Sequence, residues 1–224
     1  MTDMRARLTL LQVSDSSFPS GAFAFSHGLE GLLRDGKVTG RASIEAILTD
    51  QVIPRWLDFD RVFVSRAHTA GAEPDQLTAI DADCDVRSTA PALRNASLSI
   101  GRSLLTSHSR MKTPGASAWH AEVVRRTGCG HAAVVQGAMG RACGLDLHSV
   151  VVGALYGQVA GVTSAAIRLG KVGALEAQAM LGRVLAAAAE GLGTPCPAVP
   201  AGFAPLIDIA AQRAPRGHAR LFAN

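Results

Sequence analysis

The sequence predicts an all-α protein: a single globular helical bundle of about eight to ten helices with a Pro-rich C-terminal extension. Hydrophobic residues make up 48% of the chain and charged residues only 18%, so the chain can bury a sizeable core and does not have a disordered composition. Ala and Gly are abundant, which allows close approach of elements and favours helices. No convincing run of alternating β-branched residues predicts a strand. The bundle is expected over residues 1–194 and the extension over residues 195–224.

Apolar residues at helical spacing and Pro and Gly signals predict the elements of the first half. Two helices are expected over Leu8–Ser14 and Ser20–Arg34. Three further helices are expected to begin at Ser43, Pro74 and Pro91. Pro19 makes a stiff turn before the second helix, and Ser20 can cap that helix. Pro54 is expected to interrupt the third helix, which then resumes and ends near Gly71.

In the second half the clearest loop is 110–117. Helices are predicted through Trp119 and Val123 and over His131–Cys143, Leu147–Leu169 and Ala174–Glu190. Along the third of these, Gly153, Gly157 and Gly161 recur at a four-residue spacing that permits close packing. After Gly191 four prolines form an extended connector. The connector is expected to project residues 206–224 away from the bundle as a mobile tail that becomes ordered on a partner.

Within the predicted second helix, two stripes of side chains suggest two different contacts. Phe25, Leu29, Leu32 and Leu33 form an apolar stripe that is expected to face the core. Phe23, His27, Glu30 and Arg34 form a second stripe that is half polar. A helix with these two faces is suited to touch the core on one side and a partner on the other.

Composition and motifs also exclude several classes of function. The net charge of +4 comes from scattered basic residues without interleaved aromatics, which argues against nucleic acid as a partner. The chain lacks a phosphate-binding Gly-rich loop, a His-Glu-x-x-His motif and a Gly-x-Ser-x-Gly motif. Its seven histidines are dispersed, and Cys129 with His131 offers too few ligands for a metal site. Four cysteines without a Cys-x-x-Cys pair, and no signal-peptide core, predict reduced thiols in a cytosolic protein.

The segment 10–33 resembles the start of the urease accessory protein F (UreF) family. The resemblance lies in Asp15, in Phe18–Phe23 (Phe-Pro-Ser-Gly-Ala-Phe) and in Ser26–Glu30 (Ser-His-Gly-Leu-Glu). Further similar segments lie at Leu93–Leu105, around His131, at Ala154–Tyr156, Ala165–Gly170 and Glu176–Gln178, and near the C-terminus at Asp208–Ala210 and Arg220–Phe222. The chain departs from the family pattern at 212–219, where it lacks the acidic and aromatic residues of the family and contains Pro215 and Gly217.

The resemblance implies a non-enzymatic, cytosolic protein without a cofactor. Such a protein would bind the urease accessory proteins D/H and the GTPase accessory protein G, and the complex would help to deliver nickel to apo-urease, coupled to GTP hydrolysis by G. A homodimer formed through helices is also implied. The candidate partner-binding residues are Phe23, His27, Glu30, Tyr156, Arg168, Asp208, Arg220, Leu221 and Phe222.

From the residues alone, two other functions stay open. In the first, the protein is an α-helical enzyme in which His27 and Glu30 form an acid–base pair at the mouth of a pocket. In the second, the stretch 147–167, which contains no Asp, Glu, Lys or Arg, spans a membrane. A helix buried on all sides in a soluble bundle has the same composition. His131, which follows Gly130, is expected to satisfy the start of a helix.

Overall fold

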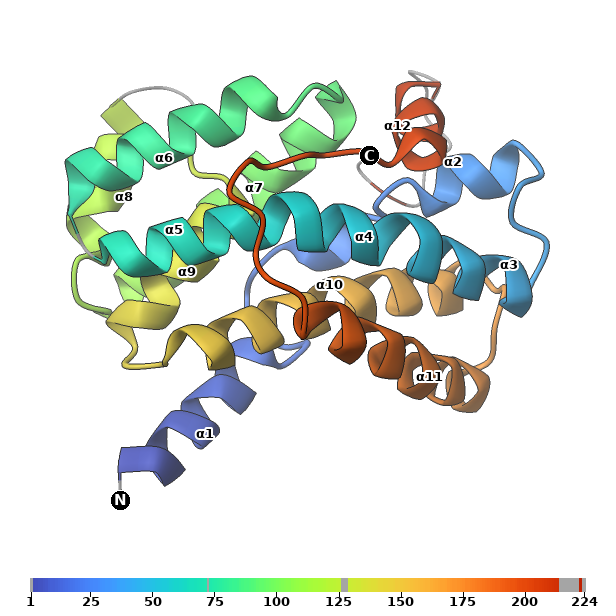
Figure 1. Cartoon of the computed structure of the whole chain (residues 1–224), viewed down its shortest axis with the longest axis horizontal. Helices are drawn as coiled ribbons and strands as arrows, with labels where there is room; N and C mark the ends of the chain where they lie inside the picture. The colour runs from blue at the N-terminus through green and yellow to red at the C-terminus, as the bar shows by residue number, and fades with distance from the viewer. Residues whose placement is uncertain (1, 72, 126–128, 214–221, 223–224) are drawn as a thin grey trace.

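The computed structural model of the chain describes residues 2–71, 73–125, 129–213 and 222 (Figure 1). Every regular element in these ranges is helical, which confirms the predicted all-α bundle. The α-helices are α1 (Thr2–Ser14), α2 (Leu29–Arg34), α3 (Arg41–Ile47), α4 (Ile53–Arg55), α5 (Arg61–Ala70), α6 (Pro74–Arg87), α7 (Pro91–Arg110), α8 (Ala116–Arg125), α9 (Ala132–Ala142), α10 (Leu147–Arg168), α11 (Ala174–Leu192) and α12 (Pro205–Gln212). Shorter turns are the 3₁₀ turn η1 (Ala22–Ala24) and the π-helical turns η2 (Leu48–Val52) and η3 (Trp56–Asp60).

The centre of the bundle is the crossing of α5 and α9, with α7 and α10 packed against them. At this crossing a Cβ atom on Gly137 would lie 2.2 Å from the backbone oxygen of Val64, so a residue with a side chain does not fit there without movement of the backbone. Fully buried side chains surround the crossing: Phe63, Val64, Val134, Val135 and Met139. The position of α9 is therefore set by direct backbone contact as well as by side-chain packing.

The predicted interruption at Pro54 is wrong. Residues 41–70 form one continuous helical segment made of α3, η2, α4, η3 and α5. In η2 the backbone N–H of Ile53 donates to the carbonyl oxygen of Leu48, five residues earlier. Such a wide turn accommodates Pro54, which has no N–H to donate and whose ring clashes with the preceding turn of an ordinary α-helix.

The predicted continuous helix Ser20–Arg34 is also wrong. The chain makes the 3₁₀ turn η1, becomes extended at Phe25 and starts α2 only at Leu29. The backbone φ is positive at Gly21, His27 and Gly28, at 72°, 52° and 85°, and a right-handed helix cannot contain these values. The apolar stripe is still directed inward, because Phe25, Leu29 and Leu32 are buried while Leu33 is partly buried.

The expectation that the tail projects away from the bundle is wrong for the residues that the structure describes. Helix α12 lies against α2 (Figure 1), and Ile207 and Ala210 are buried in the main core. The connector before it follows the long helical segment, since the Arg61 guanidinium donates to the carbonyl oxygens of Thr194 and Pro195 at 3.0 and 3.2 Å. The predicted docking tail comprises residues 206–224. Of its altered positions, 212–219, residues 214–219 lie outside the described residues.

Helix α10 tests the membrane alternative. Among the described residues it is the one helix that is long and apolar enough to cross a membrane, and half of its apolar window is buried inside the bundle. The buried side chains of α10 include Val150, Leu155, Val159 and Val162. A core helix of a soluble protein satisfies the same length and composition criteria, so α10 is weak support for a membrane span.

Candidate functional site

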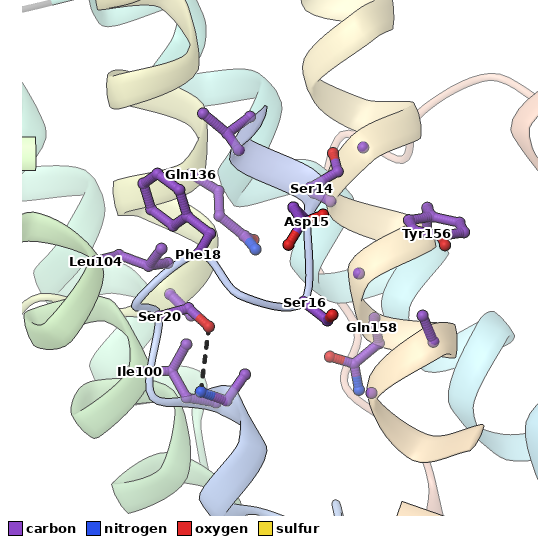
Figure 2. Close-up of a pocket in the computed structure, with 18 of the residues that line it drawn as sticks. Ser14, Asp15, Ser16, Phe18, Ser20, Ile100, Leu104, Gln136, Tyr156 and Gln158 are labelled. Atoms are coloured by element: carbon purple, nitrogen blue, oxygen red, sulfur yellow. Dashed lines mark hydrogen bonds between the residues drawn. The ribbon is translucent and has the colours of Figure 1, made fainter. Parts of the chain in front are cut away.

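A pocket of about 360 Å³ opens between α1, the segment that follows α1, and helices α7, α9 and α10. Figure 2 shows Phe18, Ile100 and Leu104 on one side of this pocket. Gln158 of α10 lies on the other side, and the segment Ser14–Ser20 runs between them. Four predicted interface residues from distant parts of the chain line the pocket: Phe23, His27, Tyr156 and Arg168. The fold therefore gathers these four predicted residues at one site.

Serine hydroxyls fix the segment between α1 and η1. The hydroxyl groups of Ser103 and Ser107, both on α7, donate to the carbonyl oxygen of Pro19 at 3.1 and 2.9 Å. The Ser20 hydroxyl accepts a hydrogen bond from the backbone N–H of Ala22 at 3.2 Å (Figure 2), which closes a local turn. The prediction that Ser20 caps a helix is wrong, because the residue at the start of η1 is Gly21 and no side chain caps this turn.

His27 lies at the kink between η1 and α2, with its ring in the pocket wall. Its Nδ1 atom is 3.2 Å from the side-chain amide nitrogen of Gln158, which can donate to a neutral imidazole. Burial and, to a smaller extent, the nearby Arg55 guanidinium together lower the pKa of His27 to about 4. An imidazole with so low a pKa is a poor general base at neutral pH, which argues against His27 as the base of the predicted acid–base pair. Glu30 lies in the first turn of α2, where its backbone N–H donates to the Ser26 hydroxyl at 3.3 Å.

Arg168, the last residue of α10, joins two segments that are far apart in sequence. Its guanidinium carbon lies 3.6 Å from the centre of the Phe23 ring and 4.3 Å from the centre of the Phe222 ring. The same guanidinium donates a hydrogen bond to the carbonyl oxygen of Phe23. Phe23 is 68% exposed whereas Phe222 is 3% exposed. The end of α10, the turn η1 and residue 222 therefore form one aromatic–cation cluster, Phe23–Arg168–Phe222.

Two neighbouring helices, α1 and α10, carry exposed apolar groups. On α1 the exposed residues Met4, Leu8 and Leu11 form a stripe, and on α10 Tyr156 and Gly157 are exposed. We call these five residues the α1–α10 face. The helices are held together where Leu10 approaches Gly153, at which a Cβ atom would lie 2.7 Å from the Leu10 side chain. Around Gly157, in contrast, a Cβ atom would meet nothing within 4 Å, so this glycine packs against nothing in the described chain.

The remaining predicted interface residues lie near the C-terminus. Asp208 is half-buried on α12, and burial raises the pKa of its carboxyl group while the Arg55 guanidinium opposes that change. Phe222 is buried in the core cluster, as described above. Arg220 and Leu221 lie outside the described residues.

Sequence reasoning placed His131 correctly at the start of a helix but missed its partners. His131 is fully buried and precedes α9; its Nε2 atom is 3.0 Å from an Asp85 carboxylate oxygen and its Nδ1 atom is 3.0 Å from the Ser97 hydroxyl. Asp81 accepts hydrogen bonds from the backbone N–H groups of Gly130 and His131, at 2.5 and 2.9 Å. Arg94 then pairs with Asp85 through two hydrogen bonds. The four-residue spacing of Asp81 and Asp85 was the available signal, because it places both carboxylates on one face of α6.

No preformed metal site is found in the described part of the chain. Among those residues, no group of three or more His, Cys, Asp or Glu side chains is arranged to hold a metal ion. The four cysteines are free; Cys84 is buried, Cys129 and Cys143 are partly buried, and Cys196 is exposed.

The fold and its site define a class: an all-α protein that presents exposed aromatic and apolar side chains around a pocket, as a protein-docking surface does.

Comparisons with known proteins name the family. The UreF family model matches residues 38–185. A urease accessory protein UreF from Trichodesmium erythraeum is 32% identical over 239 aligned positions, which cover 100% of this chain and 99% of that protein. A second, from Paracoccus denitrificans, is 34% identical and covers 95% of this chain and 94% of that protein. A third, from Mycobacterium tuberculosis, is 34% identical over 74% of both chains. The chain belongs to the UreF family of urease accessory proteins.

Proposed function

We propose that this protein acts as a non-enzymatic urease accessory protein in the cytoplasm. In complex with the D/H and G accessory proteins, it assists GTP-dependent nickel insertion into apo-urease. The observation that carries this proposal is family membership over nearly the whole chain. The described geometry is compatible with it, since the exposed aromatic and apolar groups around the pocket are of the types that anchor protein interfaces.

The α1–α10 face is the proposed homodimer contact. Its leucines, methionine and tyrosine are exposed on two adjacent helices, and Gly157 leaves room for a close approach by a second helix. Apolar side chains that are exposed together on neighbouring helices gain free energy when a partner covers them. A second copy of the chain would place the two faces against each other around a two-fold axis.

The outward side of α12 is the proposed docking surface for the D/H accessory protein. Leu206 and Ile209 of α12 are exposed there at 44% and 47%, whereas Ile207 and Ala210 on the other side of the same helix are buried. Phe203, which precedes the helix, is 78% exposed. The predicted interface residues Asp208, Arg220 and Leu221 belong to this C-terminal segment, and Phe23, His27 and Glu30 to the neighbouring segment 23–30. Helix α12 is therefore held by its inner side and can offer its outer side to a partner.

Co-purification with the D/H protein, the G protein and apo-urease tests the proposed function. Substitutions in α12 are better suited than deletion, because α12 contributes to the core. We expect Ile209→Glu to abolish capture of the D/H protein and nickel-dependent urease activation, since it places a charge on the docking surface. Leu175→Glu is the matched control, because Leu175 is 86% exposed on α11 and away from that surface. If Ile209→Glu captures D/H at wild-type affinity, the outward side of α12 is not the docking surface, and the segment around Phe23 becomes the better candidate.

Activity of the isolated chain separates the proposal from the enzyme alternative. The purified protein is expected not to hydrolyse GTP, because the sequence carries no phosphate-binding loop. Magnesium-dependent GTP hydrolysis that a point substitution in this chain removes would contradict a non-enzymatic role.

A further inference from the structure

The indole N–H of Trp56 is a hydrogen-bond donor that the fold leaves unused. Trp56 is 3% exposed and lines the pocket, and no residue in the described part of the chain accepts a hydrogen bond from its indole nitrogen. A buried indole N–H normally has a partner. The pocket is the open space that Trp56 borders, so a molecule inside the pocket is the partner available to this donor.

His27 adds a second donor to the pocket. Its Nδ1 atom faces the side-chain amide nitrogen of Gln158 at 3.2 Å and accepts from it, so the proton of the neutral ring is on Nε2. The Nε2 atom is directed towards Gly161, which also lines the pocket, because a Cβ atom added to that glycine would lie 3.8 Å from it. Among the described residues none accepts a hydrogen bond from Nε2.

Two glutamines supply acceptors to the same space. Figure 2 shows the side chains of Gln136 on α9 and Gln158 on α10 directed into the pocket from two sides. Within the described ranges the Gln136 amide has no hydrogen-bond partner, and the Gln158 amide makes one hydrogen bond, through its nitrogen, to His27. The carbonyl oxygens of both glutamines are therefore available to accept hydrogen bonds from a ligand.

The charged groups of the lining are already compensated. The Asp60 carboxylate pairs with the Arg55 guanidinium at 2.6 Å. Asp15 accepts hydrogen bonds from the backbone N–H and the hydroxyl of Ser17. The Arg168 guanidinium is stacked between two phenylalanine rings and donates to a backbone carbonyl oxygen. A charged ligand would lose its hydration without gaining an unpaired counter-charge, so the pocket favours a neutral one.

We propose that this pocket is a binding site for a neutral small molecule that carries a carboxamide group on an apolar body. The carboxamide oxygen accepts from the N–H groups of Trp56 and His27, and its NH₂ group donates to the carbonyl oxygens of Gln136 and Gln158. The apolar body packs against the apolar wall that Figure 2 shows.

The size of the pocket agrees with this assignment. A volume of about 360 Å³ lies within the range of roughly 300–1,000 Å³ that is typical of small-molecule sites. An apolar lining with a few convergent polar groups is also typical of such sites. The assignment concerns this chain alone and does not depend on the proposed function.

Titration of the full-length, nitrogen-15-labelled chain with benzamide tests the assignment by NMR. The chain has two tryptophans, Trp56 and Trp119, and a Trp119→Phe variant assigns their indole N–H resonances. Benzamide should shift the Trp56 resonance to saturation, with a dissociation constant on the order of 1 mM for so small a ligand. The Trp119 resonance should stay in place, because Trp119 is outside the pocket lining.

Benzoate and benzylamine are the matched control ligands, because they keep the ring and replace the carboxamide by a negative or a positive charge. Each should bind at least about tenfold more weakly than benzamide, since neither charge finds an unpaired partner in the pocket. The assignment is wrong if either charged ligand binds as tightly as benzamide. It is also wrong if benzamide leaves the Trp56 resonance in place up to its solubility limit.

A glutamine substitution tests the carboxamide contact itself. Gln136→Leu keeps the approximate size of the side chain but removes its amide, and should weaken benzamide binding about threefold to tenfold. Gln178→Leu is the matched control, because Gln178 is exposed on α11 and outside the pocket lining. Circular dichroism should show wild-type helicity for both variants. Benzamide binding that Gln136→Leu leaves unchanged would show that the site recognises only the apolar body, and would overturn the carboxamide assignment.

Discussion

Two helical glycines in this protein, Gly137 and Gly157, have opposite surroundings. At the crossing of α5 and α9, Gly137 lets two backbones meet, and a Cβ atom there would lie 2.2 Å from the carbonyl oxygen of Val64. On the α1–α10 face, Gly157 is exposed and a Cβ atom would meet nothing within 4 Å. The first glycine is required by the fold of a single chain. The second has no such role within the described chain.

The difference shows what a four-residue glycine spacing can predict. Gly153, Gly157 and Gly161 suggest one closely packed face, but the structure assigns them three surroundings: Gly153 touches Leu10 of α1, Gly157 is open, and Gly161 lies 3.8 Å, measured from its added Cβ position, from His27 Nε2. Close packing at Gly157 is therefore absent within the described chain, and it stays a prediction for the homodimer.

The largest expected effect comes from filling the interior contact. Gly137→Ala should destabilise the protein by about 3 kcal/mol or more, because the added methyl group collides with backbone that cannot easily move. Gly157→Ala should instead stabilise the folded chain by about 0.5–1 kcal/mol, since alanine is the better helix former and the space is open. Chemical denaturation of both variants measures the contrast. Equal effects of the two substitutions would remove the distinction between the two glycines.

The apolar stripe of the segment 25–33 provides the next largest effect. Leu29 is 1% exposed, so Leu29→Ala is expected to lower the free energy of unfolding by about 2–5 kcal/mol. Leu175→Ala is the control at an 86% exposed position, where the change should stay within about 0.5 kcal/mol. A change of less than about 0.5 kcal/mol for Leu29→Ala would mean that this stripe does not face the core.

A smaller effect concerns His27, which lies between the interior and the surface. Because its pKa falls from 6.5 to about 4 in the folded chain, the unfolded chain binds more protons between these pH values. The stability that the neutral imidazole contributes is present above pH 6.5 and is lost as the pH falls towards about 4, by at most about 3 kcal/mol. His27→Asn keeps a residue that tolerates positive φ but does not titrate.

The stability of the wild type relative to His27→Asn should therefore decrease between pH 7 and pH 4.5. Denaturation of both proteins at the two pH values measures this difference. The buried carboxyl groups titrate in both proteins and cancel in the comparison. A difference independent of pH would show that the His27 ring titrates normally and is not held neutral by burial.

The helical class, most element positions and part of the site could be predicted from the sequence, because helical periodicity and Pro and Gly signals are local. Pro91 and Gly144 bound α7 and α9 as their chemistry predicts. The break at His27 could not be predicted, because a residue with positive φ other than glycine is set by tertiary contacts such as that with Gln158. Phe222 stacks on the guanidinium of Arg168, 54 positions earlier in the printed sequence, and no local pattern reveals such a contact.

The arrangement of the pocket also depends on contacts between distant segments, which local patterns do not reveal. Phe23 and His27, predicted together on one stripe, and Tyr156 and Arg168 were all predicted as interface residues, and the structure places all four in the lining of one pocket. Their roles in binding stay predictions. The network of Asp81, Asp85 and His131 was missed because its members are on two segments far apart in sequence, and only the fold brings the carboxylates of α6 to the start of α9.

The most direct measurement of the central claim, that the α1–α10 face is a surface for a second copy, is the mass of the protein in solution by light scattering. Gly157→Lys places a long charged side chain on this face, at a position where an added Cβ atom would meet nothing within 4 Å. Gly182→Lys is the matched control, because Gly182 is also exposed on a helix, α11, and also has open space around it. The wild type and Gly182→Lys should have the mass of a dimer, and Gly157→Lys the mass of a monomer with unchanged helicity. A Gly157→Lys protein that is as dimeric as the wild type, or a wild type that is monomeric throughout the accessible concentration range, would contradict the claim.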